Sequence, residues 1–285
     1  MAYTTIDDPS AYFQTSIYTG NSGTQSITNT GNSNLQPDWI WTKARSYNDD
    51  HLFVDSVRGV TKYLKSHVTN AEQTSTIRVT AFNSDGFSLG SSSDINGNND
   101  TYVAWQWKAG TSFSNDASST SVGTIDSAGS VNTDAGFSII TYTGTGNAAT
   151  IAHGLGVKPD WIISKIRSTT GDWNVYHDAF GATGRIKFNS TGAGSNNTSI
   201  FAELPTSSVI SVGNGGDINT SSGTHIFYCF AGKQGYSKFG SYTGNGNADG
   251  SFVYLGFKPA FLIIKCTDAA RSWQIHNSKS SPFNT

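Results

Sequence analysis

The chain repeats one pattern three times, and this repetition limits the folds open to it. A Tyr-Thr-Gly triplet recurs at 18–20, 142–144 and 242–244, and a proline-led apolar run follows each copy, at 37–43, 159–165 and 259–265. The tyrosines lie 142 − 18 = 124 and 242 − 142 = 100 residues apart. Such a period is the size of a domain, whereas solenoid repeats are several times shorter. The chain is therefore an array of small domains.

The ends of the first two copies also match. Asp-Ile-Asn occurs at 94–96 and 217–219, and each copy closes with an aromatic run and Ala-Gly, at 109–110 and 231–232. The third copy reaches Thr285 without these features. We expect an arm at 1–12, complete repeats at 13–110 and 137–235, a linker and leading strand at 111–136, and a partial repeat at 236–285. A partial repeat exposes strand edges and an apolar face, so we expect another chain or further sequence to complete it.

The composition indicates an all-β fold. The chain has 31 glycines and 12% aromatic residues, and its only glutamates are Glu72 and Glu203. Apolar runs of strand length alternate with Gly/Asn clusters, which is the pattern of many short strands joined by turns. We predict tandem β-sandwich repeats of a lectin-like or jelly-roll-like kind.

Alternation within the proline-led run predicts which side chains are buried. Trp39, Trp41 and Lys43 share one side of the strand, and Ile40 and Thr42 share the other. Since one side ends in a basic residue, we expect a central strand that starts in the core and emerges at the rim. The segments 65–80 and 187–200 differ most between the copies, so we expect them to be surface loops.

Charge and targeting signals exclude several partners. Lys plus Arg (18) nearly balances Asp plus Glu (20), and no run of like charges occurs, so neither nucleic-acid binding nor membrane insertion is indicated. We find no apolar run of membrane-spanning length and no signal-peptide pattern. Cys229 and Cys266 lie in apolar runs of different copies, and we expect both to be free thiols. These features predict a soluble protein made in a cytoplasm.

Catalytic patterns are missing from the sequence. Glycoside hydrolysis needs a close pair of carboxylates, yet the two glutamates lie in different copies at positions that do not correspond. Nucleophile elbows, zinc motifs and phosphate-binding loops do not occur, and the six histidines are scattered singly. We therefore expect no enzyme activity and no cofactor.

One loop resembles a cation site. Asp94, Asn96, Asn98 and Asp100 place oxygen-bearing side chains at alternate positions around a glycine, an arrangement suited to a hard cation such as calcium. An Asx-turn between strands explains the same residues without a metal.

Carbohydrate recognition is the most reasonable molecular activity for surface repeats of this kind. Aromatic faces beside Asn and Asp suit sugars, and the candidates are Trp173, Tyr176 and Trp273. Trp173 and Trp273 correspond after 100 residues, so an anchoring role in a core or interface is the alternative.

Three segments of the second repeat carry a family resemblance. They are Gly-Phe-Ser-Ile-Ile-Thr-Tyr-Thr-Gly at 136–144, His-Gly-Leu-Gly-Val-Lys-Pro at 153–159 and Gly-Thr-His-Ile-Phe-Tyr-Cys-Phe-Ala at 223–231. Together they resemble tandem modules of virion structural proteins of marine tailed phages, cyanophage-like podoviruses, some of them described as concanavalin-like or laminin-G-like.

The resemblance implies a non-enzymatic virion protein of tail-fibre or spike type that contributes to host-surface attachment. Its expected partners are other virion proteins, further copies of itself and a host-surface glycan. A capsid decoration, head-fibre or tail-assembly protein without a ligand is the alternative, and a polysaccharide-degrading enzyme is a minor one.

Overall fold

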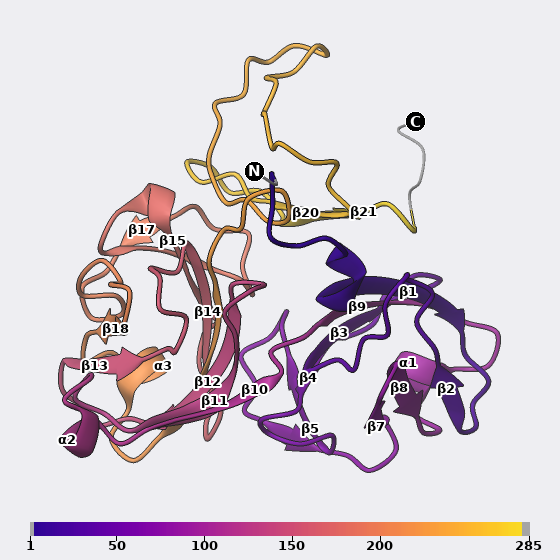
Figure 1. Ribbon diagram of the computed structural model, residues 1–285, viewed down its shortest axis with the longest axis horizontal. Coiled ribbons are helices and arrows are strands. Elements are labelled where there is room, and N and C mark those ends of the chain that lie inside the picture. Colours follow the sequence, from indigo (N-terminus) through magenta and orange to yellow (C-terminus); the bar gives the residue numbers. More distant parts are fainter. Residues whose placement is uncertain (1–2, 281–285) are drawn as a thin grey trace.

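A computed structural model describes residues 3–280 and confirms the all-β sandwich prediction. Strands make up 37% of the chain and helices 6%. Figure 1 shows two large β units, with the third repeat above them and all three meeting near the centre.

The first repeat is a sandwich of two antiparallel sheets. Its six-stranded sheet has the order β1-β9-β3-β4-β5-β6, and its three-stranded sheet has the order β2-β8-β7. Ile40, Phe87 and Tyr102 are buried between them. A 3₁₀ turn, η1, precedes the first strand, and a short helix, α1, precedes β9. The bounds are η1 Pro9–Ala11, β1 Phe13–Thr19, β2 Gln25–Ile27, β3 Trp39–Ala44, β4 His51–Asp55, β5 Lys62–Lys65, β6 Gln73–Thr74, β7 Val79–Asn83, β8 Gly86–Leu89, α1 Ser93–Asn96 and β9 Thr101–Trp107.

The second repeat is also a sandwich of two sheets. Its eight-stranded sheet has the order β10-β11-β12-β19-β14-β15-β16-β17, two strands more than in the first repeat, and its smaller sheet consists of β13 and β18, one strand fewer than in the first repeat. The bounds are β10 Thr111–Asn115, α2 Ala117–Thr120, β11 Ser127–Asn132, β12 Phe137–Thr143, β13 Ala149–Ala152, β14 Trp161–Ile166, β15 Asn174–His177, η2 Asp178–Phe180, β16 Gly184–Lys187, β17 Ser195–Asn196, β18 Val209–Val212, α3 Gly216–Asn219 and β19 Thr224–Phe230. The third repeat contributes a hairpin of β20 Phe261–Ile264 and β21 Gln274–Asn277.

We expected the segment 111–136 to be a linker followed by a leading strand, and this expectation is wrong. β10 and β11 form a hairpin, and β11 pairs with β12 along its whole length. Gly129 permits this pairing, because a Cβ there would lie 1.8 Å from the carbonyl oxygen of Ile139. The segment is thus an extension of the second sheet.

Strand register confirms that the two complete repeats correspond. Trp39 and Trp161 lie opposite Trp107 and Phe230, the last residues of the closing strands. Ala44 and Ile166 in turn lie opposite Tyr102 and His225. β3 and β14 are central strands, each flanked on both sides, as the alternation predicts.

The recurring Tyr-Thr-Gly and Asp-Ile-Asn motifs bind each other. In the first repeat the Tyr18 hydroxyl donates to the carbonyl of Ile95 (2.9 Å), and the side chain of Asn96 accepts from the amide of Asn21 (3.0 Å). In the second repeat Tyr142 donates to Ile218 (2.5 Å), and Asn219 accepts from Thr145 (2.9 Å). The two motifs recur together because each satisfies the other's polar groups.

The glycine of the triplet is required by this close approach. A Cβ on Gly20 would lie 2.1 Å from the carbonyl oxygen of Gly97, and one on Gly144 would lie 2.3 Å from that of Thr220. Any larger residue would separate the two motifs.

The tryptophan side of the central strands faces the other repeats. A shared aromatic core joins the three repeats, with Trp39, Trp41 and Phe53 from the first, Trp161 and Tyr228 among those from the second, and the hairpin of the third packed against it. Trp39 stacks on Tyr228 with ring centroids 4.7 Å apart, and Phe261 lies 5.5 Å from Trp105. The expectation that the strand emerges at the rim is wrong for the second repeat, where Lys165 is only 1% exposed.

The contact between the first and second repeats and the contact between the second and third use equivalent hydrogen bonds. The indole nitrogen of Trp173 donates to the carbonyl of Lys65 (3.0 Å), and that of Trp273 donates to Lys187 (3.1 Å). Lys65 and Lys187 correspond, because each ends the strand that pairs with β4 or β15.

Further bonds repeat in the same way. The ammonium groups of Lys165 and Lys265 donate to the carbonyls of Thr69 (3.2 Å) and Thr191 (3.1 Å). The amides of Gly171 and Arg271 donate to the same two carbonyls. Segments 65–72 and 187–194 are thus interfaces between repeats, and the expectation of surface loops is wrong there.

Candidate functional site

The structure places two of the three glycan candidates in the interior. Trp173 and Tyr176 are both 0% exposed. The indole of Trp173 donates to the carbonyls of Lys65 and Val68, and the hydroxyl of Tyr176 donates to Asp178 (3.0 Å). Neither side chain can contact a sugar at the surface. The alternative, an anchor in a core or interface, describes both residues.

Trp273 also anchors the packing. Its ring lies edge-on to Phe188 with centroids 4.9 Å apart, and its nitrogen donates to Lys187. It is half-buried, so part of its ring serves the packing between the second and third repeats.

The calcium candidates do not converge on one point. Asp94 forms an ion pair with Arg78, and Asp100 accepts from Ser46 (3.1 Å). Asn96 is 0% exposed and donates to the carbonyls of Gly23 and Gly90. Among residues 3–280 no three His, Cys, Asp or Glu side chains group as metal ligands. Asn98 follows α1 in the turn that leads to β9.

A buried ionic cluster joins the first two repeats. Arg58 donates to Asp55 (2.6 Å) and Glu72 (3.2 Å), and the side chains of Arg58 and Asp55 are 0% exposed. From the second repeat, Tyr228 donates to Asp55 (2.7 Å) and Arg167 to Glu72 (2.9 Å). Each acid thus has donors from both repeats.

The pKa shifts of Arg58 and Glu72 favour their charged forms. Burial acts to lower the pKa of Arg58, but the charges of Asp55, Tyr228 and Glu72 together with the hydrogen bond to Asp55 outweigh it, and the pKa is raised. Burial acts to raise the pKa of Glu72, but the hydrogen bond from Arg167 and the charge of Arg58 lower it. Arg58 and Glu72 therefore stay charged and paired, and a substrate has no access to the side chains of Arg58 and Asp55, which are 0% exposed. The cluster is a structural joint.

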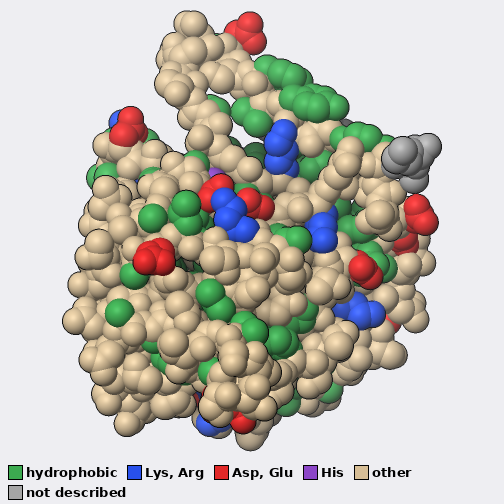
Figure 2. Space-filling model, turned by 60° about the vertical axis from the view of Figure 1, so that its left-hand side comes forward, with side chains coloured by type: hydrophobic (Ala, Val, Ile, Leu, Met, Phe, Trp, Pro, Cys, Tyr) green, Lys and Arg blue, Asp and Glu red, His purple; other side chains and the backbone are tan. Residues whose placement is uncertain are grey.

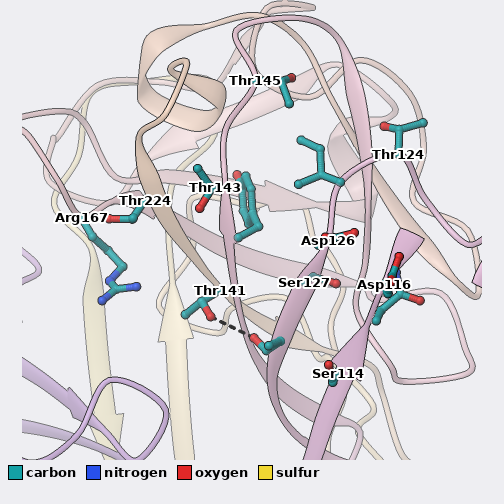
Figure 3. Close-up of a pocket in the computed structure, with 14 residues that line it drawn as sticks. Ser114, Asp116, Thr124, Asp126, Ser127, Thr141, Thr143, Thr145, Arg167 and Thr224 are labelled. Atoms are coloured by element: carbon teal, nitrogen blue, oxygen red, sulfur yellow. Dashed lines mark hydrogen bonds between the residues drawn. The ribbon is translucent and has the colours of Figure 1, made fainter. Parts of the chain in front are cut away.

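The best candidate site is a polar groove on the second repeat (Figure 3). It has a cavity volume of about 620 Å³, within the range of small-molecule sites. Its lining comes from the β10–β11 hairpin, β12, the start of β19 and the residue that follows β14. The lining residues are Ser114, Asn115, Asp116, Thr124, Ile125, Asp126, Ser127, Ala128, Thr141, Tyr142, Thr143, Thr145, Arg167 and Thr224.

Hydroxyl groups dominate the groove, and some are free to bind a ligand. Thr141 donates to the carbonyl of Ala128 (3.0 Å), the contact dashed in Figure 3. Thr143 and Thr224 lie opposite each other in neighbouring strands, and their hydroxyls make no hydrogen bond within residues 3–280. Arg167 lies at one side of these threonines and Asp126 at the other.

The carboxylates of the groove have structural roles. Asp116 caps α2 by accepting from the amides of Ser118 (3.0 Å) and Ser119 (3.1 Å), and the hydrogen bonds from Ser118 and Ser119 lower its pKa. Asp126 accepts from the amide of Ala117 (2.8 Å). Both carboxylates therefore hold the α2 turn in place. The groove can offer hydroxyl, carboxylate and guanidinium groups to a polar, uncharged ligand.

Our sequence interpretation missed this groove. The small residues of Ser127–Asn132 lack the apolar alternation of a strand, so their pattern predicts a linker. The available signal was Asp116 before Ala117–Thr120, which is a helix cap inside a supposed linker. A capped turn between two polar runs is typical of a hairpin.

Two further findings bear on the remaining expectations. No helix in the part of the chain that the structure describes is long and apolar enough to span a membrane. Both cysteines are free: Cys229 is buried, with its thiol pKa raised to about 12 by burial, and Cys266 is partly exposed.

Comparison with known proteins gives one match. The family described as a domain of unknown function, DUF7483, matches residues 8–285. No curated protein and no solved structure matches the chain.

Proposed function

Because the chain belongs to the DUF7483 family, with no described activity to carry over, we propose a function from its own geometry. We propose that it is a non-enzymatic phage virion structural protein of tail-fibre or spike type, exposed on the particle and contributing to host-surface attachment. The hydroxyl-lined groove of the second repeat is the observation that carries the binding role. The sequence resemblance to phage virion modules supports the placement on a particle.

The packing of the repeats supports a display role. Their tryptophans lie in the shared core or pack against it, while turns rich in Ser, Thr, Asn and Gly lie between the strands. A rigid centre with polar outer turns holds a binding surface in a fixed position, so binding does not lose free energy to ordering that surface.

The groove suits a neutral glycan. Sugar hydroxyls both donate and accept, and Thr143 and Thr224 can do the same, with Asp126 and Arg167 as a flanking acceptor and donor. The groove has no exposed aromatic platform among its lining residues. Binding at one groove is therefore weak, and attachment depends on several copies acting together.

The test compares two matched double variants. Thr143→Val/Thr224→Val removes both free hydroxyls and keeps β-branched shape. Thr19→Val/Thr101→Val makes the same change at the corresponding pair of the first repeat, where β1 is the edge of the sheet and no β10–β11 hairpin is present. Two lost hydrogen bonds of about 1 kcal/mol each predict about thirtyfold weaker binding to host cells or purified host glycans for the first variant only.

Labelling of intact particles with an antibody completes this test. Label on the tail or its fibres, together with binding that the groove variant loses, supports attachment. Equal binding by both variants would reject the groove as the binding site.

The alternative function is assembly without a ligand, as a capsid decoration, head-fibre or tail-assembly protein. The exposed apolar side chains of the third repeat favour it, since such surfaces mark contacts with other chains. Uniform capsid labelling without glycan binding would support this alternative. Release of new reducing ends from host polysaccharides would instead support the minor alternative, a polysaccharide-degrading enzyme.

A further inference from the structure

The groove of the second repeat contains one side chain that the first repeat holds in place. Arg167 lines the groove, and its guanidinium donates from Nε to Glu72 Oε2 (2.9 Å) and from Nη2 to Glu72 Oε1 (3.2 Å). This two-point contact fixes the position and the plane of the guanidinium. Its Nη1 group makes no hydrogen bond within residues 3–280, so both N–H groups of that nitrogen can bind a ligand. Glu72 thus acts on the groove from outside its lining.

This ion pair is not needed to join the repeats. In the contact between the first and second repeats, the amide of Glu72 donates to the carbonyl of Arg167 (2.8 Å). In the contact between the second and third, the amide of Gly194 donates to the carbonyl of Thr267 (2.8 Å). Both contacts therefore have the backbone bond, and the second forms with glycine and threonine in place of the charged pair. The pair occurs only in the contact that adjoins the groove.

The strand geometry does not hold the arginine either. Arg45 is at the corresponding position of the first repeat. Its amide donates to the carbonyl of Thr101 (2.7 Å), and that of Arg167 to Thr224 (2.7 Å), so the backbone is the same in both repeats. Arg45 is nevertheless exposed and forms no ion pair within residues 3–280. A fixed guanidinium at this position requires an acid from another repeat, and Glu72 supplies it.

The ion pair also sets the charge that a ligand meets. Among the described residues that line the groove, Arg167 is the only cation, and Asp116 and Asp126 are the only anions. Glu72 balances the charge of Arg167, so the guanidinium attracts a carboxylate only weakly, while the two aspartates repel one. A sugar hydroxyl carries no charge and accepts a hydrogen bond from Nη1 without this repulsion.

The rest of the surface adds no general attraction for an acidic polymer. The formal net charge of the chain is −2, and Figure 2 shows mainly uncharged surface in which basic and acidic side chains are scattered. Selection between neutral and acidic ligands therefore depends on the few charges in and beside the groove.

We propose that Glu72 of the first repeat is a positioning and specificity-determining residue of the groove, and that it makes the groove selective for neutral glycans over acidic ones. It holds Arg167 at one side of Thr143 and Thr224 and balances its charge. The binding site is thus shared between two repeats, because the first supplies the residue that orients a ligand-binding group of the second. This inference rests on the proposed attachment function, whose site is the same groove.

The test measures selectivity with two forms of one ligand. The probes are the neutral fraction of host polysaccharide and the same material after oxidation of its primary hydroxyls to carboxylates, each immobilised for binding by the full chain. The wild-type chain should bind the neutral polymer more tightly. Glu72→Gln keeps the shape of the side chain and one acceptor for Arg167 but removes the charge. We expect the ratio of the two affinities to shift towards the oxidised polymer by about tenfold, the change expected from one charge-assisted hydrogen bond.

Two further variants separate this role from a structural one. Trp173→Phe removes the hydrogen bonds to Lys65 and Val68 in the same contact and changes no charge. Any weakening that it causes should affect both polymers equally and leave the ratio unchanged. Glu72→Gln/Arg167→Gln removes both charges of the pair and should return the ratio to the wild-type value or below, because the aspartates of the groove remain.

The outcomes distinguish this inference from the proposed function. An unchanged ratio in Glu72→Gln, or a wild-type preference for the oxidised polymer, would overturn the inference and leave the attachment function standing. An equal change of the ratio in Trp173→Phe would assign the effect to loosening of the contact and would also overturn it. If Thr143→Val/Thr224→Val binds both polymers as well as the wild type does, the groove is not the binding site and both proposals fail.

Discussion

Replacement of Trp173 tests the assignment of this residue to the interface between repeats. Its indole is 0% exposed and donates to the carbonyls of Lys65 (3.0 Å) and Val68 (3.1 Å). Truncation of a buried tryptophan to alanine lowers the free energy of unfolding of a protein by about 3–5 kcal/mol. This is a large part of the stability of an ordinary domain. Trp173→Phe keeps most of the apolar contact and leaves both carbonyls without their donor, so the hydrogen-bonding loss alone is about 2 kcal/mol.

Trp41 is the matched control, because it belongs to the same aromatic cluster and is 1% exposed. Its indole nitrogen makes no hydrogen bond within residues 3–280, so Trp41→Phe loses packing but no bond. Urea unfolding followed by circular dichroism should therefore show Trp173→Phe to be about 2 kcal/mol less stable than Trp41→Phe. Equal stabilities would refute the hydrogen-bond argument. If Trp173→Phe lost glycan binding at unchanged stability, the assignment of Trp173 to the interface between repeats would be wrong.

Three further substitutions test other features of the fold. Burial lowers the pKa of His225 to about 4, although nearby backbone carbonyls of Thr220 and Asp217 offset part of this effect. Because the pKa of His225 in the folded state lies below the unfolded value near 6.5, its neutral form stabilises the fold fully above pH 6.5, and this stabilisation falls as the pH drops towards 4, by about 2 kcal/mol at pH 5. His225→Tyr introduces the residue that the first repeat has at this position and should remove this contribution to the pH dependence of the melting temperature. Arg58→Met leaves the buried Asp55 without its cation and should cost about 3–5 kcal/mol in urea unfolding, with part regained on adding Asp55→Asn. Asn219→Ala should cost about 2–3 kcal/mol, because buried backbone groups lose their partner; a loss below 1 kcal/mol would contradict the role of this asparagine.

The repeats and their strand order were predictable, because alternation and turn residues are local signals. Trp39 and Trp161 occupy corresponding central strands, and Tyr102 corresponds to His225, as expected. The function of the recurring motifs was not predictable, since Tyr18 and Asn96 are far apart in sequence and meet only in the fold.

The association of the repeats was also hidden from the sequence. A strand that is buried on one side by its own sandwich and on the other by a neighbouring repeat has the same alternation as one that emerges at a rim. Lys165 suggested solvent exposure, yet its ammonium group donates to a carbonyl of the first repeat, and burial lowers its pKa to about 8. The groove was missed for the opposite reason, because the strand Ser127–Asn132 carries small residues where an apolar pattern was required.

The head-to-tail contact between repeats has a consequence for how the molecule can change. Three separate chains joined by the same contact would carry every substitution three times, and a damaging change would weaken all contacts together. Here the copies are tethered, so each interface holds its partner at a high effective concentration and can vary by itself. Lys165 and Lys265 keep the same bond to Thr69 and Thr191, while Arg167 in one interface is Thr267 in the other. One chain can thus keep two equivalent contacts at its centre and still present different outer surfaces.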